Sequence, residues 1–98
     1  MIVDYSPGEE MSLVEPEDFK SFKLRLRNTS ESRPALPGVA FVDDRNVLVA
    51  IDAVTQLPGM PGTEEWHAGF RKMIDYAATK GWIDAATNSI RAHVERVP

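Results

Sequence analysis

The sequence has no cysteine among its 98 residues. Disulfide bonds, thiolate metal sites and a cysteine nucleophile are therefore excluded. Only two histidines are present, His67 and His93, so a zinc site would need carboxylate ligands. We expect neither a metal nor a cofactor.

Long apolar runs are also missing. No stretch approaches the roughly 20 apolar residues that a membrane-spanning helix needs. Residues 1–10 have neither the basic start nor the apolar stretch of a secretion signal. No catalytic or nucleotide-binding motif is present either. The default expectation is a cytoplasmic protein that does not contact membranes.

The charged residues that are present are unevenly distributed. Apolar residues make up 43% of the chain and charged residues 27%, as in an ordinary globular domain. The net charge is −4, but residues 1–18 carry six acidic and no basic side chains, whereas residues 19–33 carry five basic and one acidic. Because residues 1–18 also contain proline and glycine breakers, we predict a loosely ordered acidic arm there and a single domain over residues 19–98. Alternatively, the arm folds back over the basic segment, because opposite charges attract at short range.

Residues Phe19 to Arg27 alternate in the manner typical of a strand. The apolar side chains that would share one face are Phe22, Leu24 and Leu26. The cations on the opposite face would be Lys23, Arg25 and Arg27. This stripe supports a hypothesis of polyanion or nucleic-acid binding. The net negative charge and the missing RNA-binding motifs argue against nucleic acid.

A β-hairpin is predicted over Gly38 to Val54. The runs Val39 to Val42 and Val47 to Val54 are apolar at nearly every position, and turn-forming residues separate them. Such runs are typical of strands that are covered on both faces. One helix covers one face, so the other face needs the acidic arm, a partner chain or a ligand.

A helix is predicted from Thr63 to Lys80. Thr63 is the expected N-cap, acidic residues follow in the first turn, and Gly81 is the expected C-terminal cap residue. One stripe of this helix is apolar and consists of Trp66, Phe70, Met73 and Ala77.

The last segment fits two structures. Ile90, Ala92 and Val94 alternate with polar residues, which predicts a strand. The same region also fits a helix that begins at Asp84. We choose the strand, which gives an α+β fold of order β-β-β-α-β: a small, mainly antiparallel sheet with one amphipathic helix packed on one face. The alternative order is β-β-β-α-α.

Two polar residues are weak candidates for catalysis. Asp52 is a carboxylate in an otherwise apolar run, so it needs a partner or solvent. If His67 approached it, the pair would resemble a general acid–base dyad. The competing interpretation is that Asp52 caps a turn or meets an arginine such as Arg91.

Three apolar residues are candidates for contact with a ligand or protein partner: Met60, Trp66 and Trp82. Met60 lies in a proline-rich connector that would hold it outward as an adaptable contact. The two tryptophans would be interface anchors if they were exposed, although core packing is the competing interpretation.

Together these features favour a non-catalytic binding or interaction module that forms a homodimer through its sheet. The first alternative is a ligand-binding protein or enzyme with a pocket near Asp52 and His67. The second is a polyanion binder that uses Lys23, Arg25 and Arg27.

Overall fold

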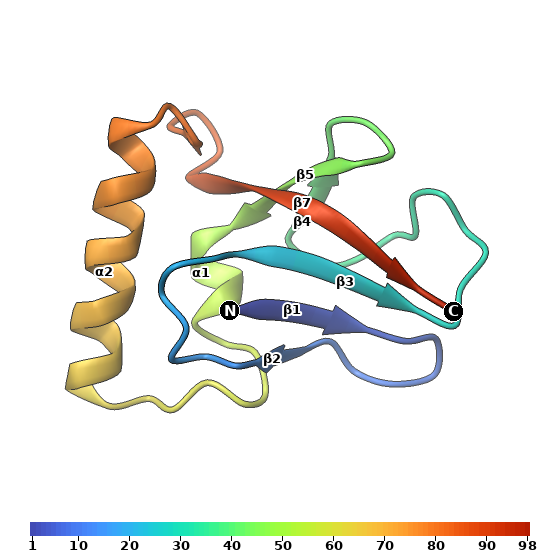
Figure 1. Cartoon of the computed structure of the whole chain (residues 1–98), viewed down its shortest axis with the longest axis horizontal. Coiled ribbons are helices and arrows are strands. Elements are labelled where there is room, and N and C mark those ends of the chain that lie inside the picture. The colour runs from blue at the N-terminus through green and yellow to red at the C-terminus, as the bar shows by residue number, and fades with distance from the viewer.

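A mixed seven-stranded sheet and two helices make up the computed structural model, which describes residues 1–98 (Figure 1). The strands are β1 (Ile2–Tyr5), β2 (Ser12–Val14), β3 (Lys23–Arg27), β4 (Val39–Phe41), β5 (Asn46–Ala50), β6 (Ile83–Asp84) and β7 (Ser89–Val97). The helices are α1 (Ile51–Val54) and α2 (Glu64–Thr79). The predicted α+β class with a small sheet and one long helix is confirmed.

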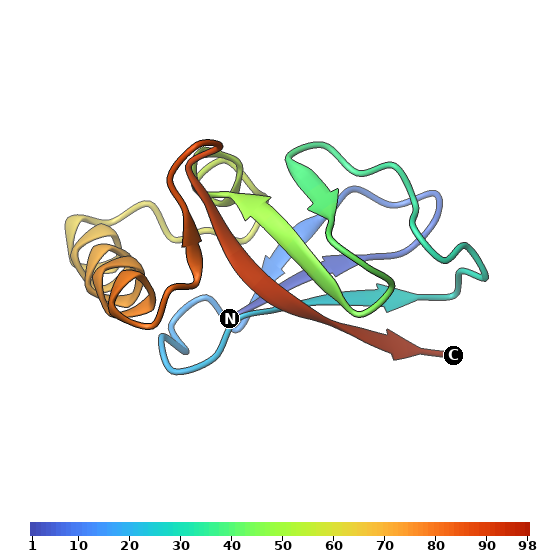
Figure 2. The ribbon, with the colours of Figure 1, turned by 90° about the horizontal axis from the view of Figure 1, so that it is seen from above.

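The centre of the sheet joins segments that are far apart in the sequence. The strand order is β2-β1-β3-β7-β5-β4, and β6 pairs with β7 outside this row. β3 lies parallel to both β1 and β7, whereas the other four pairings are antiparallel. The sheet is strongly twisted, so its two ends differ in direction (Figure 2).

Residues 1–18 contribute the strands β1 and β2 to this sheet, which differs from the loosely ordered arm that the sequence predicts. β1 lies between β2 and β3, and Met1, Ile2 and Val3 are buried. The acidic charge that suggested disorder is partly neutralised, because Asp4 lies beside the cations of β3. The alternative in which the arm folds back over the basic segment describes the structure better.

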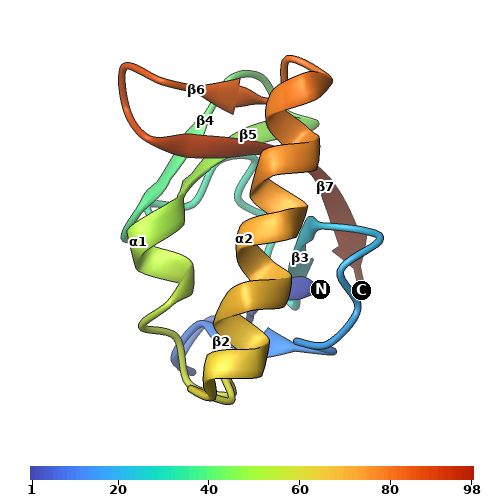
Figure 3. The ribbon, with the colours of Figure 1, turned by 90° about the vertical axis from the view of Figure 1, so that its left-hand side faces the viewer.

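Helix α2 begins and ends as the sequence predicts. The Oγ1 of Thr63 accepts a hydrogen bond of 3.1 Å from the backbone N–H of Trp66. Gly81, just after the helix, has a φ of +76°, which side chains other than glycine rarely adopt. All four residues of the predicted apolar stripe are buried. The helix lies across one end of the strands (Figures 1 and 3).

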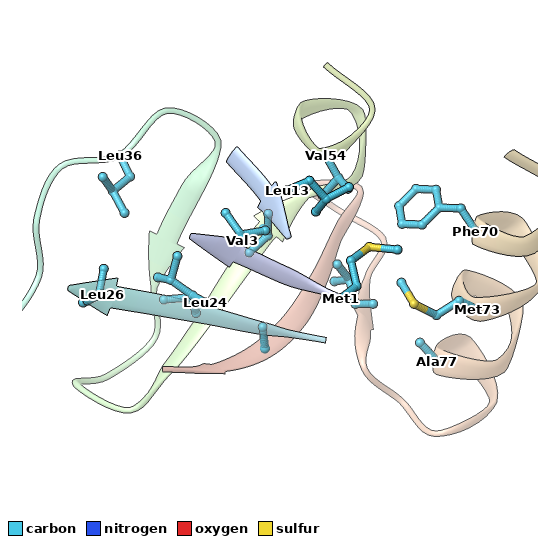
Figure 4. Packing of buried hydrophobic residues seen from close by; sticks show 14 of the residues in the cluster. Met1, Val3, Leu13, Leu24, Leu26, Leu36, Val54, Phe70, Met73 and Ala77 are labelled. Atoms are coloured by element: carbon cyan, nitrogen blue, oxygen red, sulfur yellow. The ribbon is translucent and has the colours of Figure 1, made fainter. Parts of the chain in front are cut away.

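The predicted hairpin forms, but its second strand is shorter than expected. β4 and β5 pair antiparallel through Val39 to Phe41, and β5 ends at Ala50. Ile51–Val54 is the short helix α1 instead of strand, which corrects the prediction for these residues. The turn directs Val54 inward, where it is fully buried in the same core cluster as Leu13 and Met1 (Figure 4). A continued strand would not have filled this end of the core.

The C-terminal segment is a strand, as we chose over the helical alternative. β7 pairs with β3 on one side and with β5 on the other. The two-residue strand β6, which the sequence did not indicate, lies against the start of β7.

The core fills the inner face of the sheet and the space between the sheet and α2. Leu24 and Leu26 of β3 point into it, and Leu36 covers them from the loop that precedes β4 (Figure 4). At the other end, Phe70 and Met73 of α2 face Met1 (Figure 4). No helix of the structure is both long and apolar enough to cross a bilayer.

Candidate binding groove

A groove of about 830 Å³ lies between the C-terminal half of α2, strand β7 and the segment 19–22. Its floor is apolar and consists of residues that are themselves buried in the core, namely Met73, Ala77, Ile90 and Ala92. Phe22, which is partly buried, adds an aromatic wall. The size falls in the range of about 300–1,000 Å³ that small-molecule sites occupy.

Two exposed aromatic residues form the rim of the groove. The exposed fractions are 57% for Tyr76 and 45% for Trp82. The two ring centroids are 6.2 Å apart, and the planes meet at 71°, an edge-to-face arrangement. Large aromatic side chains left half in water over an apolar floor are typical of binding surfaces.

The backbone on both sides holds Trp82 in place. Its N–H donates to the carbonyl of Ala77 at 3.0 Å, which closes the end of α2. Its own carbonyl accepts a hydrogen bond of 2.8 Å from the N–H of Arg91 in β7. The backbone of Trp82 is therefore hydrogen-bonded to both α2 and β7, although its ring is exposed.

The segment 19–22 is held by the first residue of the chain. The amino group of Met1 donates hydrogen bonds of 2.9 Å to the carbonyls of both Asp18 and Ser21. The carboxylate of Asp18 accepts from the N–H of Lys20 and from the hydroxyl of Ser21, both at 3.0 Å. These bonds fix the wall of the groove that carries Lys20 and Phe22.

The charged residues of the groove are all basic. Lys20 and Arg91 line it together with His93, and no aspartate or glutamate does. The side chains of Lys20 and Arg91 make no ion pair in the structure. The groove therefore carries positive charge in a chain whose net charge is negative, and the carboxylates of Asp18 and Asp43 interact with Lys20 and Arg91 only beyond ion-pair distance.

The predicted cationic stripe on β3 has a different environment. Asp4 accepts hydrogen bonds of 2.8 Å from Nε of Arg25 and from Nη2 of Arg27. Lys23 pairs with Glu95 at 2.9 Å. The hydrogen bond from Arg27 is the main cause that lowers the pKa of Asp4 below its usual value, and Arg25 adds to it, whereas burial opposes it. The whole stripe is engaged in ion pairs and has less charge to offer a polyanion than the sequence suggests.

The structure places Asp52 and His67 on different helices, both exposed. Asp52 lies in α1 and His67 in α2, and no hydrogen bond or ion pair joins them. His67 lies instead among polar residues of the outer helix surface, including Glu64 and Arg71. No group of three or more potential metal ligands occurs anywhere in the structure.

The three predicted contact residues lie in different environments. Trp66 is buried, its Nε1 donates to the carbonyl of Pro16 at 2.7 Å, and its ring stacks on that of Phe70. Met60 is partly buried against the core. Trp82 is the one that lies in the groove.

Sequence reasoning missed most of the groove. It did not identify Lys20, Phe22, Tyr76 or His93 as parts of one site. The sequence did indicate that Tyr76 is exposed, because this aromatic residue lies beside the apolar stripe of α2 rather than in it.

In comparisons with known proteins, no protein-family model, no curated protein and no solved structure matches this chain. The assignment of a site therefore rests on its geometry.

Proposed function

We propose that this chain is a non-catalytic binding module whose site is the groove between α2 and β7. The observation that carries this proposal is the pair of half-exposed rings, Tyr76 and Trp82, over a buried apolar floor. Exposing two large aromatics to water forgoes the stabilisation of burying them, roughly 1.5–3 kcal/mol per large apolar side chain. A bound ligand would recover part of that stabilisation.

The polar groups around the groove support binding rather than catalysis. Ser21 and His93 both line it, but the hydroxyl of Ser21 donates to Asp18 and not to the imidazole. A serine nucleophile needs a base that accepts its proton. The remaining polar lining groups are two cations, the amide of Asn46, the hydroxyl of Tyr76 and the indole N–H of Trp82, all of which can orient a ligand.

The proposal can be tested by mapping amide chemical shifts while a mixture of small aromatic and aliphatic compounds is added. We expect shifts that cluster at Lys20, Tyr76, Trp82 and Arg91. Trp82→Ala should abolish them, whereas the matched variant Trp82→Phe should retain most of them, because the phenyl ring keeps the apolar contact. Shifts that cluster elsewhere, or none at millimolar compound, would refute the proposal.

A second candidate function is self-association through the sheet, which one observation favours. β4 is an edge strand without a charged residue. Ala40 in the strand and Val42 just after it are both exposed. Natural edge strands usually carry charges or bulges that prevent pairing with a second sheet. Two copies that paired through β4 would form a continuous sheet across a symmetric contact.

Light scattering during gel filtration, at two concentrations, tests this second candidate. We expect twice the chain mass for the natural sequence and a single chain mass for Ala40→Lys, which places a charge on the edge. Ala68→Lys, on the exposed surface of α2, is the matched control and should remain a dimer. A monomer at both concentrations would contradict self-association.

A further inference from the structure

We infer that the groove binds a small organic anion with a flat apolar body, such as an aryl carboxylate or sulfonate. This inference rests on the proposed function, because it names the class of ligand for the same groove. Three features of the groove carry it: the pattern of free charge, the arrangement of the rings and the size of the hollow.

The first feature is the contrast between two groups of cations on neighbouring surfaces. Lys23, Arg25 and Arg27 are each matched by a carboxylate. Lys20 and Arg91 make no ion pair, although Asp18 and Asp43 lie near enough to interact with their charges, and no acidic residue lines the groove. In a protein with more acidic than basic residues, two unpaired cations in one apolar groove favour an anionic ligand by charge complementarity.

The second feature is the pair of rings. Because Tyr76 and Trp82 meet edge to face at 71°, the face of at least one ring remains open for a planar group to stack on. Nζ of Lys80, which does not line the groove, lies over the Tyr76 ring at 5.5 Å from its centre, so the indole of Trp82 is the ring on which a ligand would stack. A ligand with a flat body and an acidic group would use both the rings and the cations.

The third feature is the size. A hollow of about 830 Å³ is large for a simple ion and is suited to a molecule of several rings. Polymers such as nucleic acid are disfavoured, because the net charge of −4 repels a long polyanion beyond the groove. A small molecule with a single charged group avoids that repulsion.

Two fluorescent probes that differ in one group test the inference. Anilinonaphthalene sulfonate has an aromatic body and an anionic group, and phenylnaphthylamine has the same body without the charge. We expect the sulfonate to bind more tightly, and we expect its affinity to fall as salt is raised, since exposed charges are screened.

Variants separate the contributions of charge and rings. Lys20→Gln with Arg91→Gln should weaken the sulfonate about three- to tenfold per charge removed and leave the neutral probe unchanged. Trp82→Ala should weaken both probes. Lys72→Gln removes an exposed cation outside the groove and should change neither. A cooperative thermal transition and an unchanged circular dichroism spectrum would show that each variant is folded.

The outcomes distinguish the two proposals. If both probes bind equally and the charge variants change neither affinity, the anionic ligand class is refuted while the groove remains a binding site. If neither probe binds, or if Trp82→Ala leaves both affinities unchanged, the groove is not the site and the proposed function fails with it.

Discussion

Substitution of Asp4 by asparagine is the sharpest test of how the charges of this domain are arranged. The Asp4 side chain is buried, at 6% residue exposure, and accepts hydrogen bonds from both Arg25 and Arg27. Asp4→Asn keeps the size of the side chain but removes its charge. Two guanidinium groups would then lose the one carboxylate that they share.

The magnitude follows from the exposure of the partners. Breaking a fully buried ion pair by removing one member costs about 3–5 kcal/mol, whereas an exposed pair contributes under about 1 kcal/mol. The side chains of Arg25 and Arg27 retain 25% and 33% exposure, so water replaces part of what is lost. We therefore expect Asp4→Asn to lower the free energy of unfolding by about 2 kcal/mol, a substantial part of a small domain's stability.

The effect should depend on pH in a defined direction. The pKa of Asp4 is lowered in the folded state, mainly by the hydrogen bond from Arg27, so the unfolded chain takes up this proton first as pH falls. The stabilisation is complete above the unfolded pKa of about 3.9 and disappears as pH falls through the lower folded pKa. The lowered pKa values of Asp18 and Asp43 add their own acid dependence, but they are present in both proteins and cancel in the difference.

Urea unfolding followed by circular dichroism, at about pH 7 and about pH 3, measures both quantities. Glu9→Gln is the matched control, because Glu9 pairs with the same Arg27 at 3.3 Å but its side chain is 64% exposed. It should cost less than about 0.5 kcal/mol. The reasoning is refuted if Asp4→Asn costs no more than this control, or if its cost is as large in acid as at neutral pH.

Three further substitutions test the packing, each by urea unfolding against the natural sequence. Gly69→Ala should destabilise by about 1–3 kcal/mol although alanine favours helix, because the new Cβ would lie 2.5 Å from Cε2 of Phe19; a gain in stability would contradict this contact. Val54→Ala should cost about 2 kcal/mol, because α1 places this side chain fully inside the core; a cost below about 0.5 kcal/mol would mean that α1 does not fill it. Thr63→Ala should cost about 1 kcal/mol, because it removes the acceptor for the N–H of Trp66. Thr63→Ser keeps a hydroxyl acceptor and should retain the stability of the natural sequence.

Helix α2 was predictable because its determinants are local. The cap at Thr63, the left-handed residue Gly81 and the apolar spacing between them all lie within the segment that they define. β7 was predictable for a similar reason, since the alternation of Ile90, Ala92 and Val94 survives in the structure. Local signals of this kind need no information about which segments become neighbours.

Strand β1 was not predictable from the same kind of signal. Residues 1–18 have the composition of a disordered acidic arm, and partners that lie far away in the sequence, above all those on β3, order it in the fold. The carboxylate of Asp4 can be buried in the sheet because Arg25 and Arg27 donate hydrogen bonds to it. Both arginines lie more than twenty residues later in the sequence. The alternation on β3 predicted where the cations point but not which strand would lie beside them.

The groove could not be predicted because three separate segments build it. Lys20 comes from the loop before β3, Tyr76 from α2 and Arg91 from β7. Tyr76 gave a signal within its own segment, but Lys20 and Arg91 did not, and these two meet only because β3 pairs in parallel with β7. Of the three predicted contact residues, Trp82 lies in the groove, because it follows the glycine that ends the helix.

The two sets of cations support a general interpretation of charge in this chain. Arg25 and Arg27 form the most conspicuous basic pattern in the sequence, and folding uses that charge to bury Asp4 beside the core. Lys20 and Arg91 come from separate segments of the chain, and folding brings them to one groove without an ion pair. Charge that the fold has neutralised contributes to stability, whereas charge that it leaves unpaired beside an apolar surface remains for a ligand. The residues to test for function are therefore Lys20 and Arg91, the two cations of the groove.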